Sequence, residues 1–180
     1  MTKSITIAVD AMGGENSPIK IIDAIELYHR ENKNIIYKIF GNQNIIEKII
    51  LNKSINKENY ELIHTEEKIK NEDSPLFAAK RGKKTSMWLA IESVKNKLSD
   101  IVLSAGNTGA LFVIAKLNFN MIENIDKPAL SGLWPNKTGM NVVLDLGANI
   151  ECNEKNLTDF ACMGSALFKS LFVSDKPRIA

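Results

Sequence analysis

Short apolar runs alternate with longer amphipathic segments along most of the 180 residues of this chain. The first run, residues 5–9, is rich in β-branched side chains, and the segment 18–29 that follows carries isoleucines near helical spacing. Strands that alternate with helices of this length are typical of a parallel sheet covered by helices on both faces. The chain is therefore predicted to be an α/β protein with a mostly parallel sheet.

The same alternation continues towards the end of the chain. Further strands are expected at residues 35–40, 60–64, 101–103, 128–134 and 141–146. Further helices are expected at residues 44–51, 74–97 with a break near Gly82, 107–118 and 157–172. The run 141–146 is nearly all apolar, which predicts a central strand buried on both faces.

The composition, with 44% hydrophobic and 24% charged residues, is that of an ordinary globular protein. The 23 basic and 21 acidic residues nearly balance, which argues against a nucleic-acid binder. No segment reaches the roughly 20 apolar residues that span a bilayer, and no signal peptide is evident. We therefore expect a soluble, cytoplasmic protein, and the length favours one domain.

The cysteines give no sign of a metal site or a disulfide framework. Cys152 and Cys162 form no CxxC pair, and neither shares metal-ligand spacing with His29 or His64. Each cysteine is therefore predicted to be a buried, reduced thiol, and no metal is expected.

Three predicted strands end in glycine-containing turns: DAMGG at 10–14, SAGNTG at 104–109 and LDLGAN at 144–149. Ligands of open parallel sheets bind in the crevice outside the carboxyl ends of the strands. The three turns are thus placed to converge on one crevice.

The turn 104–109 carries the most chemical information. Glycine lets the backbone approach a ligand closely, and Asn107 or Thr108 can cap the helix that follows. A helix N-terminus presents free N–H groups and partial positive charge, so phosphate or a phosphate ester is the expected ligand. The plainer alternative is that Gly106 and Gly109 only make a tight turn between strand and helix.

Several other side chains allow two interpretations. Asp10 and Asp145 each end an apolar strand, either as loop-organising residues or as site residues that orient a ligand. His64 also ends a strand, where it is either structural or directed at the crevice. The basic stretch 80–84 also has two interpretations, a solvated helix face or an anion-binding group. Its basic residues are Lys80, Arg81, Lys83 and Lys84.

Common nucleotide-binding and nucleophile motifs are missing from the sequence. It contains no P-loop, no G-x-G-x-x-G turn after a strand and no G-x-S-x-G elbow. It also offers no nucleophile with an evident base. A reaction at this crevice would therefore rely on substrate positioning and electrostatic stabilisation rather than on a covalent enzyme intermediate.

The turns and their flanks closely resemble the PlsX family, the acyl-ACP:phosphate acyltransferases. The family opening V-D-A-M-G-G-D matches residues 9–14, with Glu15 as the acid and Pro18 nearby. The signature S-A-G-N-T-G-A-L stands intact at 104–111. Three further family motifs are matched: D-x-P at 73–75, L-D-L-G-A-N at 144–149 and L-x-x-F-A-x-M-G at 157–164. Two more are matched with changes. Residues 83–87 resemble K-K-x-S-S-M, and residues 127–130 match R-P-A-L with Lys127 in place of the arginine.

This resemblance implies a three-layer α/β/α architecture like that of the isocitrate and isopropylmalate dehydrogenases and the phosphotransacetylases, with a homodimer when full length. It implies transfer of a fatty acyl group from acyl carrier protein to inorganic phosphate, giving acyl phosphate for phospholipid synthesis. No metal or organic cofactor is implied, and contact with the membrane periphery stays open. The alternatives are a phosphotransacetylase-like enzyme that uses acyl-coenzyme A and a non-catalytic interaction module.

The residues at these turns fit this chemistry and supply the candidate site residues. Phosphate is expected to bind at Gly13, Gly14, Arg81, Ser104, Gly106, Asn107, Thr108 and Gly109. Arg81 or Lys84 would neutralise its charge. The catalytic candidates, which would orient substrate or transfer a proton, are Asp10, His64, Lys84 and Asn149.

Members of the PlsX family are usually nearly twice as long as this chain. They continue with V-G-L-L-N-I-G after a P-R pair that here stands at Pro177–Arg178. Residues 1–180 are therefore expected to be the N-terminal part of a single phosphate acyltransferase domain whose C-terminal half is missing. The corresponding alternative for function is an inactive, truncated fragment of the fold.

Overall fold

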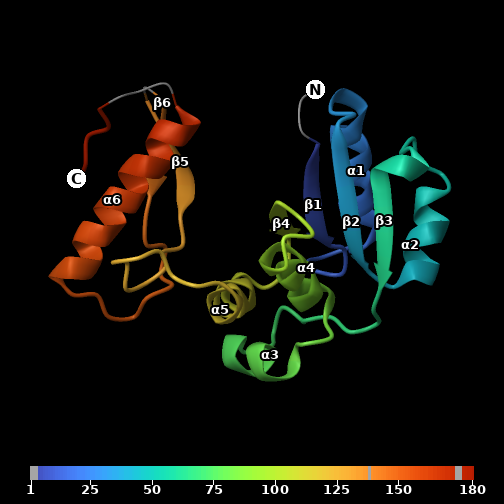
Figure 1. Ribbon diagram of the computed structural model, residues 1–180, viewed down its shortest axis with the longest axis horizontal. Coiled ribbons are helices and arrows are strands. Elements are labelled where there is room, and N and C mark those ends of the chain that lie inside the picture. Colours follow the sequence, from blue (N-terminus) through green and yellow to red (C-terminus); the bar gives the residue numbers. More distant parts are fainter. Residues whose placement is uncertain (1–3, 138, 173–175) are drawn as a thin grey trace. The chain divides into compact units, whose positions relative to one another are not determined.

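The computed structural model describes residues 4–137, 139–172 and 176–180, without the side chain of Arg81. The chain divides into two compact units, residues 1–119 and residues 120–180, and each is described by itself (Figure 1). The first unit contains a parallel sheet with helices, and the second contains an antiparallel strand pair and one long helix.

The sheet of the first unit has the strand order β3-β2-β1-β4, and every pairing in it is parallel. Its strands are β1 (Ile5–Asp10), β2 (Ile35–Gly41), β3 (Tyr60–His64) and β4 (Ile101–Ser104). The register sets Asp10 beside Phe40 on one side and Ser104 on the other. The ends of β1 and β4 therefore lie side by side, so that the turns 10–14 and 104–109 start from adjacent positions.

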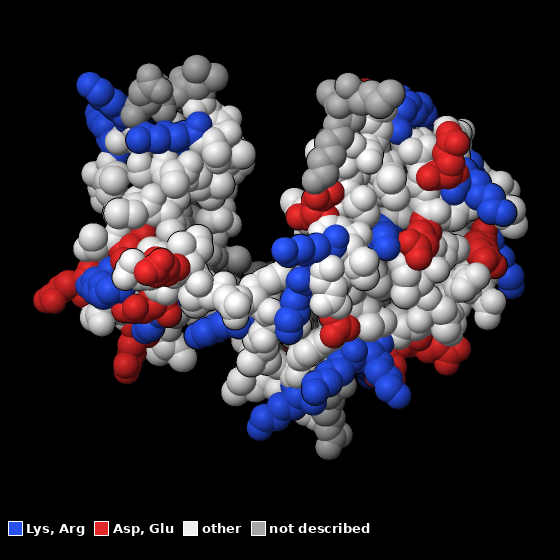
Figure 2. Space-filling view, viewed as in Figure 1, with Lys and Arg blue, Asp and Glu red and all other residues white. Residues whose placement is uncertain are grey.

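Helices cover both faces of this sheet, as the sequence pattern predicted. Val9 and Ile39 belong to an apolar cluster with residues of α1 (Ile19–Glu31) and α2 (Gln43–Ile50). On the opposite face, Ala8 and Phe40 pack against Ala90 of α4 (Ser86–Lys95). The three-layer α/β/α architecture is thereby confirmed, and charged side chains of both signs lie on the face of the unit that Figure 2 shows.

The long helical region expected at 74–97 consists of two helices. α3 (Pro75–Arg81) ends before Gly82, and Thr85 caps the start of α4 by accepting a hydrogen bond from the Trp88 N–H. The predicted break near Gly82 is therefore confirmed. The remaining helices of this unit are the short η1 (Lys57–Asn59) and α5 (Thr108–Asn118), and α5 packs with α3 and α4 around a second apolar cluster.

The second unit corrects one prediction about the sheet. β5 (Gly132–Asn136) and β6 (Gly139–Val143) pair antiparallel in a two-stranded sheet, and Met140 and Asn141 are exposed. The central strand predicted at 141–146 is therefore wrong in the described residues. A short apolar run has the same composition in a buried central strand and in a half-covered hairpin, so the run alone does not distinguish them.

The cysteine prediction is also wrong, because both Cys152 and Cys162 are exposed. Cys162 lies on α6 (Glu154–Leu171), whose buried residues are Asn156 and Phe160. Two residues beyond Phe160, a side chain is turned about 200° around the helix axis, so Cys162 points away from the covered face.

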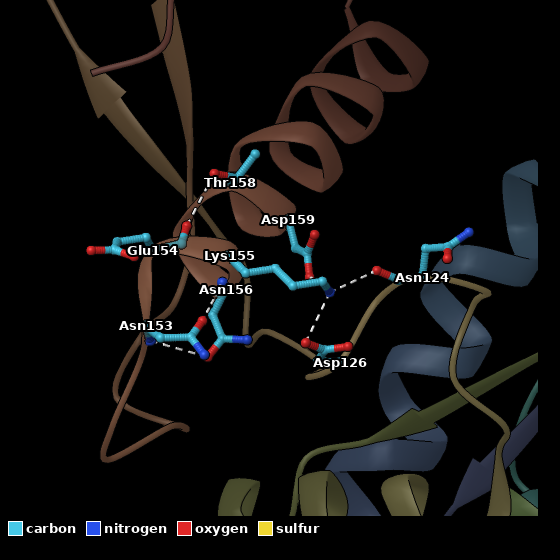
Figure 3. Close-up of polar contacts among 8 residues, drawn as sticks. All are labelled: Asn124, Asp126, Asn153, Glu154, Lys155, Asn156, Thr158 and Asp159. Carbon is cyan, nitrogen blue, oxygen red and sulfur yellow. Dashed lines mark hydrogen bonds and ion pairs between the residues drawn. The ribbon is translucent and has the colours of Figure 1, made fainter.

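The start of α6 is held by polar contacts that Figure 3 shows. Asn153 and the buried Asn156 form a reciprocal capping box, each side chain accepting from the other's backbone N–H. The Lys155 ammonium contacts the carboxylates of Asp126 at 2.8 Å and Asp159 at 3.1 Å. Exposed ion pairs of this kind contribute at most about 1 kcal/mol each, so their effect is to position the segment around Asp126 against α6.

None of the helices in the parts of the chain that the structure describes is long and apolar enough to cross a bilayer.

The packing of α2 gives a test of the first unit's core with neighbouring isoleucines. Ile46 is fully buried, whereas Ile45 is 46% exposed. We expect Ile46→Ala to lower the free energy of unfolding by about 2–4 kcal/mol through lost burial and the cavity left behind. The matched variant Ile45→Ala is expected to change it by less than about 1 kcal/mol. Urea denaturation of both variants measures this, and equal losses would contradict the packing described.

Candidate active site

A buried carboxylate joins three segments at the end of the parallel sheet. Asp10 is only 1% exposed, and its Oδ1 accepts hydrogen bonds from Ser86 Oγ at 2.5 Å and from the Met12 N–H at 3.2 Å. Its Oδ2 accepts from Ser104 Oγ at 2.7 Å. The carboxylate thus connects the turn after β1 with the first residue of α4 and the last residue of β4.

The sequence produces this junction through register and helix capping. Parallel pairing sets Asp10 opposite Ser104, and the Thr85 cap starts α4 so that Ser86 stands at its first turn. A buried carboxylate is costly unless it is hydrogen-bonded, and these donors meet that need. Of the two interpretations of Asp10, these contacts are those of a loop-organising residue.

The turn 104–109 is fixed internally as well. Ser104 Oγ, which donates to Asp10, also accepts from the Gly106 N–H at 3.1 Å. Asn107 caps α5 by accepting from the Ala110 N–H at 2.9 Å, which confirms the predicted cap. Each hydrogen bond removes freedom from the backbone, so the turn is held in one conformation before any ligand binds.

The Asn107 amide group is directed at the segment before α3. Its Nδ2 donates to the carbonyl oxygens of Asn71 at 2.9 Å and Asp73 at 3.0 Å. Together with the cap, these bonds engage both ends of the side-chain amide. The contribution of Asn107 in this structure is therefore to hold the turn and the segment 71–73 together.

The groups left available at this turn are backbone N–H groups and one hydroxyl. Among the described residues, the N–H groups of Thr108 and Gly109 donate to no protein acceptor, as is usual in the first turn of a helix. Thr108 is exposed and carries its hydroxyl at the same helix end. Free N–H groups, a hydroxyl and the positive end of the α5 dipole together suit an anion.

Glycines allow the two turns to touch. A Cβ added to Gly13 would lie 3.0 Å from the Gly106 Cα and 2.5 Å from Asp10 Oδ2. Gly14 has a φ of +88°, and a Cβ there would lie 2.5 Å from the Ala105 carbonyl oxygen. The turn 10–14 therefore lies directly against the turn 104–109, which brings together two of the three predicted segments.

The cationic candidates and His64 belong to segments other than the two turns. Lys84 is exposed in the loop before α4, where its carbonyl accepts from Thr65 Oγ1 at 2.5 Å, and Arg81 closes α3 with its side chain outside the described residues. His64 ends β3, two strands away from β1, and its Nδ1 accepts from the Gln43 N–H at 3.3 Å. In the described residues no hydrogen bond or ion pair links His64 to Asp10 or to the turn 104–109.

The third predicted segment belongs to the second unit and forms a closed loop of its own. Asp145 accepts hydrogen bonds from the backbone N–H groups of Leu130, Ala148 and Asn149 and from the Asn149 side chain. Asn149 Nδ2 also donates to the Pro128 carbonyl at 2.8 Å. Partial burial raises the pKa of Asp145, but the hydrogen bonds outweigh this effect, and its pKa lies below the ordinary value.

Comparison with known proteins agrees with this arrangement. A profile described as "Fatty acid synthesis protein" matches residues 5–180. The chain belongs to this family. The resemblance carried by the turns is thereby confirmed, and it covers both units.

Relatives of the chain carry a more specific name than the family does. The chain is 62% identical over 180 residues to a protein of Pelagibacter ubique (strain HTCC1062) named phosphate acyltransferase, covering 100% of this chain and 54% of that one. It is 36% identical over 179 residues to the phosphate acyltransferase of Paramagnetospirillum magneticum, covering 99% and 51%. The phosphate acyltransferase of Parvibaculum lavamentivorans is 38% identical over 180 residues, covering 99% and 50%. The chain spans about half the length of the curated relatives it matches.

Sequence reasoning missed one residue of this family member's site. Ser86 donates the shorter of the two hydroxyl hydrogen bonds to Asp10 and is 1% exposed. The sequence could have indicated Ser86, because it directly follows the capping Thr85 in the stretch 83–87 that resembles a family motif. In the described residues, no three histidine, cysteine or acidic side chains gather as metal ligands would.

The Asp10 junction predicts strong coupling between its members. Asp10→Ala leaves the Ser86 hydroxyl buried without its acceptor, and we expect a loss of about 2–4 kcal/mol in the free energy of unfolding. The double variant Asp10→Ala/Ser86→Ala should lose at least about 1 kcal/mol less than the sum of the single variants. As a control, Asp10→Ala/Ser93→Ala should be additive, because Ser93 bonds instead to Ser99. Additivity in both pairs, measured by urea denaturation, would disprove the junction.

The Asp145 loop predicts a pH-dependent contribution to the second unit. Because the folded pKa of Asp145 is lowered, its stabilisation is present above the unfolded value near 4 and is lost as pH falls through the folded value. Asp145→Asn should cost about 1–3 kcal/mol near pH 7 and progressively less below about pH 4. Denaturation followed by NMR signals of α6 measures the difference. A cost that stays constant between pH 7 and pH 3 would contradict this assignment.

Proposed function

We propose that this chain provides the phosphate site for transfer of a fatty acyl group from an acyl carrier protein thioester to inorganic phosphate, forming acyl phosphate for phospholipid synthesis. The observation that carries the proposal is the turn 104–109, which is fixed by Asp10 and leaves N–H groups free at the start of α5. The name phosphate acyltransferase, which the relatives bear, supports it. The chain spans about half the length of those proteins, and the proposal concerns the phosphate site alone.

The reaction requires that phosphate, the nucleophile, is held in place and that the negative charge developing on the thioester carbonyl oxygen is stabilised. A phosphate oxygen attacks the thioester carbonyl carbon, the new C–O bond forms, and the C–S bond breaks as the tetrahedral intermediate collapses. The thiolate leaves and takes up a proton, so that acyl phosphate and a free thiol result. Fixed N–H donors contribute because they need no reorganisation when charge develops, and no covalent enzyme intermediate is required.

Each site residue has a proposed role that follows its position. The hydroxyl of Thr108 and the N–H groups of Thr108 and Gly109 would hold phosphate, while Ser104, Gly106 and Asn107 shape the turn. Gly13 and Gly14 contribute by letting the neighbouring turn pack against it. Asp10 is a positioning residue.

The remaining assignments rest on the family resemblance. Lys84 or Arg81 would neutralise the phosphate dianion, since such an ion needs a cation or several N–H donors. His64 and Asn149 are the candidates for proton transfer or for orienting the thioester. Three further points are proposed on the same basis: a carrier-protein donor, a homodimer of the full-length enzyme and a cytoplasmic location. Contact with the membrane periphery stays open.

Removal of one hydroxyl tests the phosphate site without disturbing the helix cap. We expect Thr108→Val to weaken binding of inorganic phosphate by about 3–10-fold, the equivalent of one hydrogen bond. The matched control Thr158→Val, on the exposed surface of α6, should leave phosphate affinity unchanged. Isothermal titration calorimetry of the chain with phosphate measures both.

The donor is tested separately from phosphate. Acyl-phosphate formation is assayed with acyl carrier protein and coenzyme A thioesters of the same acyl chain, using the chain and a full-length relative. The proposal expects the carrier-protein thioester to be preferred. Unchanged phosphate affinity in Thr108→Val, or preference for the coenzyme A donor, would count against the corresponding half of the proposal.

A further inference from the structure

One face of the first unit combines basic and apolar side chains beside the turn 104–109. We call it the α3 surface and define it by Leu76, Phe77, Lys80, Lys83 and Lys84, which are all exposed. Leu76 is 67% and Phe77 48% exposed. Figure 2 shows a group of basic side chains over this part of the unit, where Figure 1 places α3.

The inner side of α3 explains why these residues face outward. Ala78 and Ala79 are buried and pack with residues of α4 and α5 in one apolar cluster. The residues on the other side of the helix therefore lie at the surface. No acidic residue occurs between positions 74 and 91, and the nearest ones before this stretch are Glu72 and Asp73, directly before α3.

Hydrogen bonds and close packing connect α3 to the turn of the proposed phosphate site. Asn107 binds the carbonyls of Asn71 and Asp73, directly before α3. Gly109 lies so close to Pro75, the first residue of α3, that an added Cβ would approach its Cγ to 2.7 Å. A partner seated on the α3 surface would therefore lie next to the free N–H groups of α5.

We propose that the α3 surface docks the carrier protein that presents the acyl thioester, and that this carrier has an acidic surface. The identity of the donor rests on the proposed function, whereas the position and charge of the docking surface come from the structure. Lysines match carboxylates of the partner and speed its encounter, and Leu76 and Phe77 supply apolar contact at the centre. A free small thioester would need no such surface.

An anionic membrane is the other class of partner that lysines with exposed apolar side chains attract. The attachment to Asn107 and Gly109 favours the carrier, because a thioester arm must reach the turn from a partner bound beside it. A bilayer seated on the α3 surface would have no such need for proximity to the phosphate site.

Charge reversal on the α3 surface tests the proposal. The binding of a fluorescently labelled, acidic acyl carrier protein in its acyl form is followed by anisotropy with the full chain. We expect Lys80→Glu/Lys83→Glu to weaken binding at least about 10-fold, since close charge pairs at interfaces contribute this much or more. The control Lys95→Glu/Lys97→Glu makes the same charge change at the other end of α4 and should change affinity less than about 2-fold. Lys84 is left intact because it is a candidate phosphate ligand.

Two further measurements make every outcome decisive. Leu76→Ser keeps all charges and should also weaken carrier binding, which guards against a purely non-specific charge effect. Co-sedimentation with vesicles of phosphatidylglycerol and phosphatidylethanolamine tests the membrane alternative with the same variants. The proposal is overturned if the unmodified chain does not bind the carrier, or if both charge-reversal variants bind it equally well. It is also overturned if the carrier does not bind while vesicles do, and vesicle binding is lost in Lys80→Glu/Lys83→Glu.

Failure of the docking proposal is distinct from failure of the proposed function. Phosphate titration of Leu76→Ser should give the affinity of the unmodified chain, because the substitution keeps every charge and Leu76 is not assigned to the phosphate site. If phosphate binds but the carrier does not discriminate between the variants, only the docking surface is wrong. If phosphate fails to bind the unmodified chain, the proposed function itself is contradicted, whatever the carrier does.

Discussion

The hydrogen-bonded carboxylate of Asp10 is the interaction on which the rest of the first unit's site depends. A carboxyl group that is 1% exposed is costly unless donors surround it, and here Ser86, Ser104 and the Met12 N–H do so. Those donors come from three separate segments, so the hydrogen bonds that satisfy Asp10 also fix where the segments lie. The glycines of the turn 10–14 follow from this closeness, because a Cβ at Gly13 would meet the carboxylate itself.

A turn that is fixed in this way is suited to holding an anion. Ser104 restrains Gly106, and Asn107 caps α5 while binding the segment before α3, so little of the turn would have to rearrange on binding an anion. Preorganised donors of this kind are worth more than flexible ones, since the cost of ordering them is met when the protein folds. The same bonds of Asn107 place the α3 surface beside the turn, so the fold relates where phosphate would bind to where an acyl carrier would dock.

Much of this arrangement could be predicted from the sequence, because the relevant signals are local. The run 5–10 and the run 101–104 end in polar residues, and parallel strands bring such ends to one edge, so the meeting of Asp10 with the turn 104–109 followed from the pattern. The cap by Asn107 also followed from residue type. What could not be predicted depends on pairing between distant segments: the hairpin that includes residues 141–143, the bonds from Asn107 to residues 71–73, and the role of Ser86. Nothing in those stretches specifies a partner until the register is known.

The central claim is that the N–H groups at the start of α5 bind phosphate, and NMR measures it residue by residue. In a titration of the ¹⁵N-labelled chain with inorganic phosphate at constant pH and ionic strength, the amide signals of Thr108 and Gly109 should shift most and saturate with one common dissociation constant. The amide of Asn44 in the first turn of α2 serves as the reference, since it lies at another helix N-terminus of the same unit. Shifts of equal size and affinity at both helix ends, or none at Thr108 and Gly109, would contradict the account.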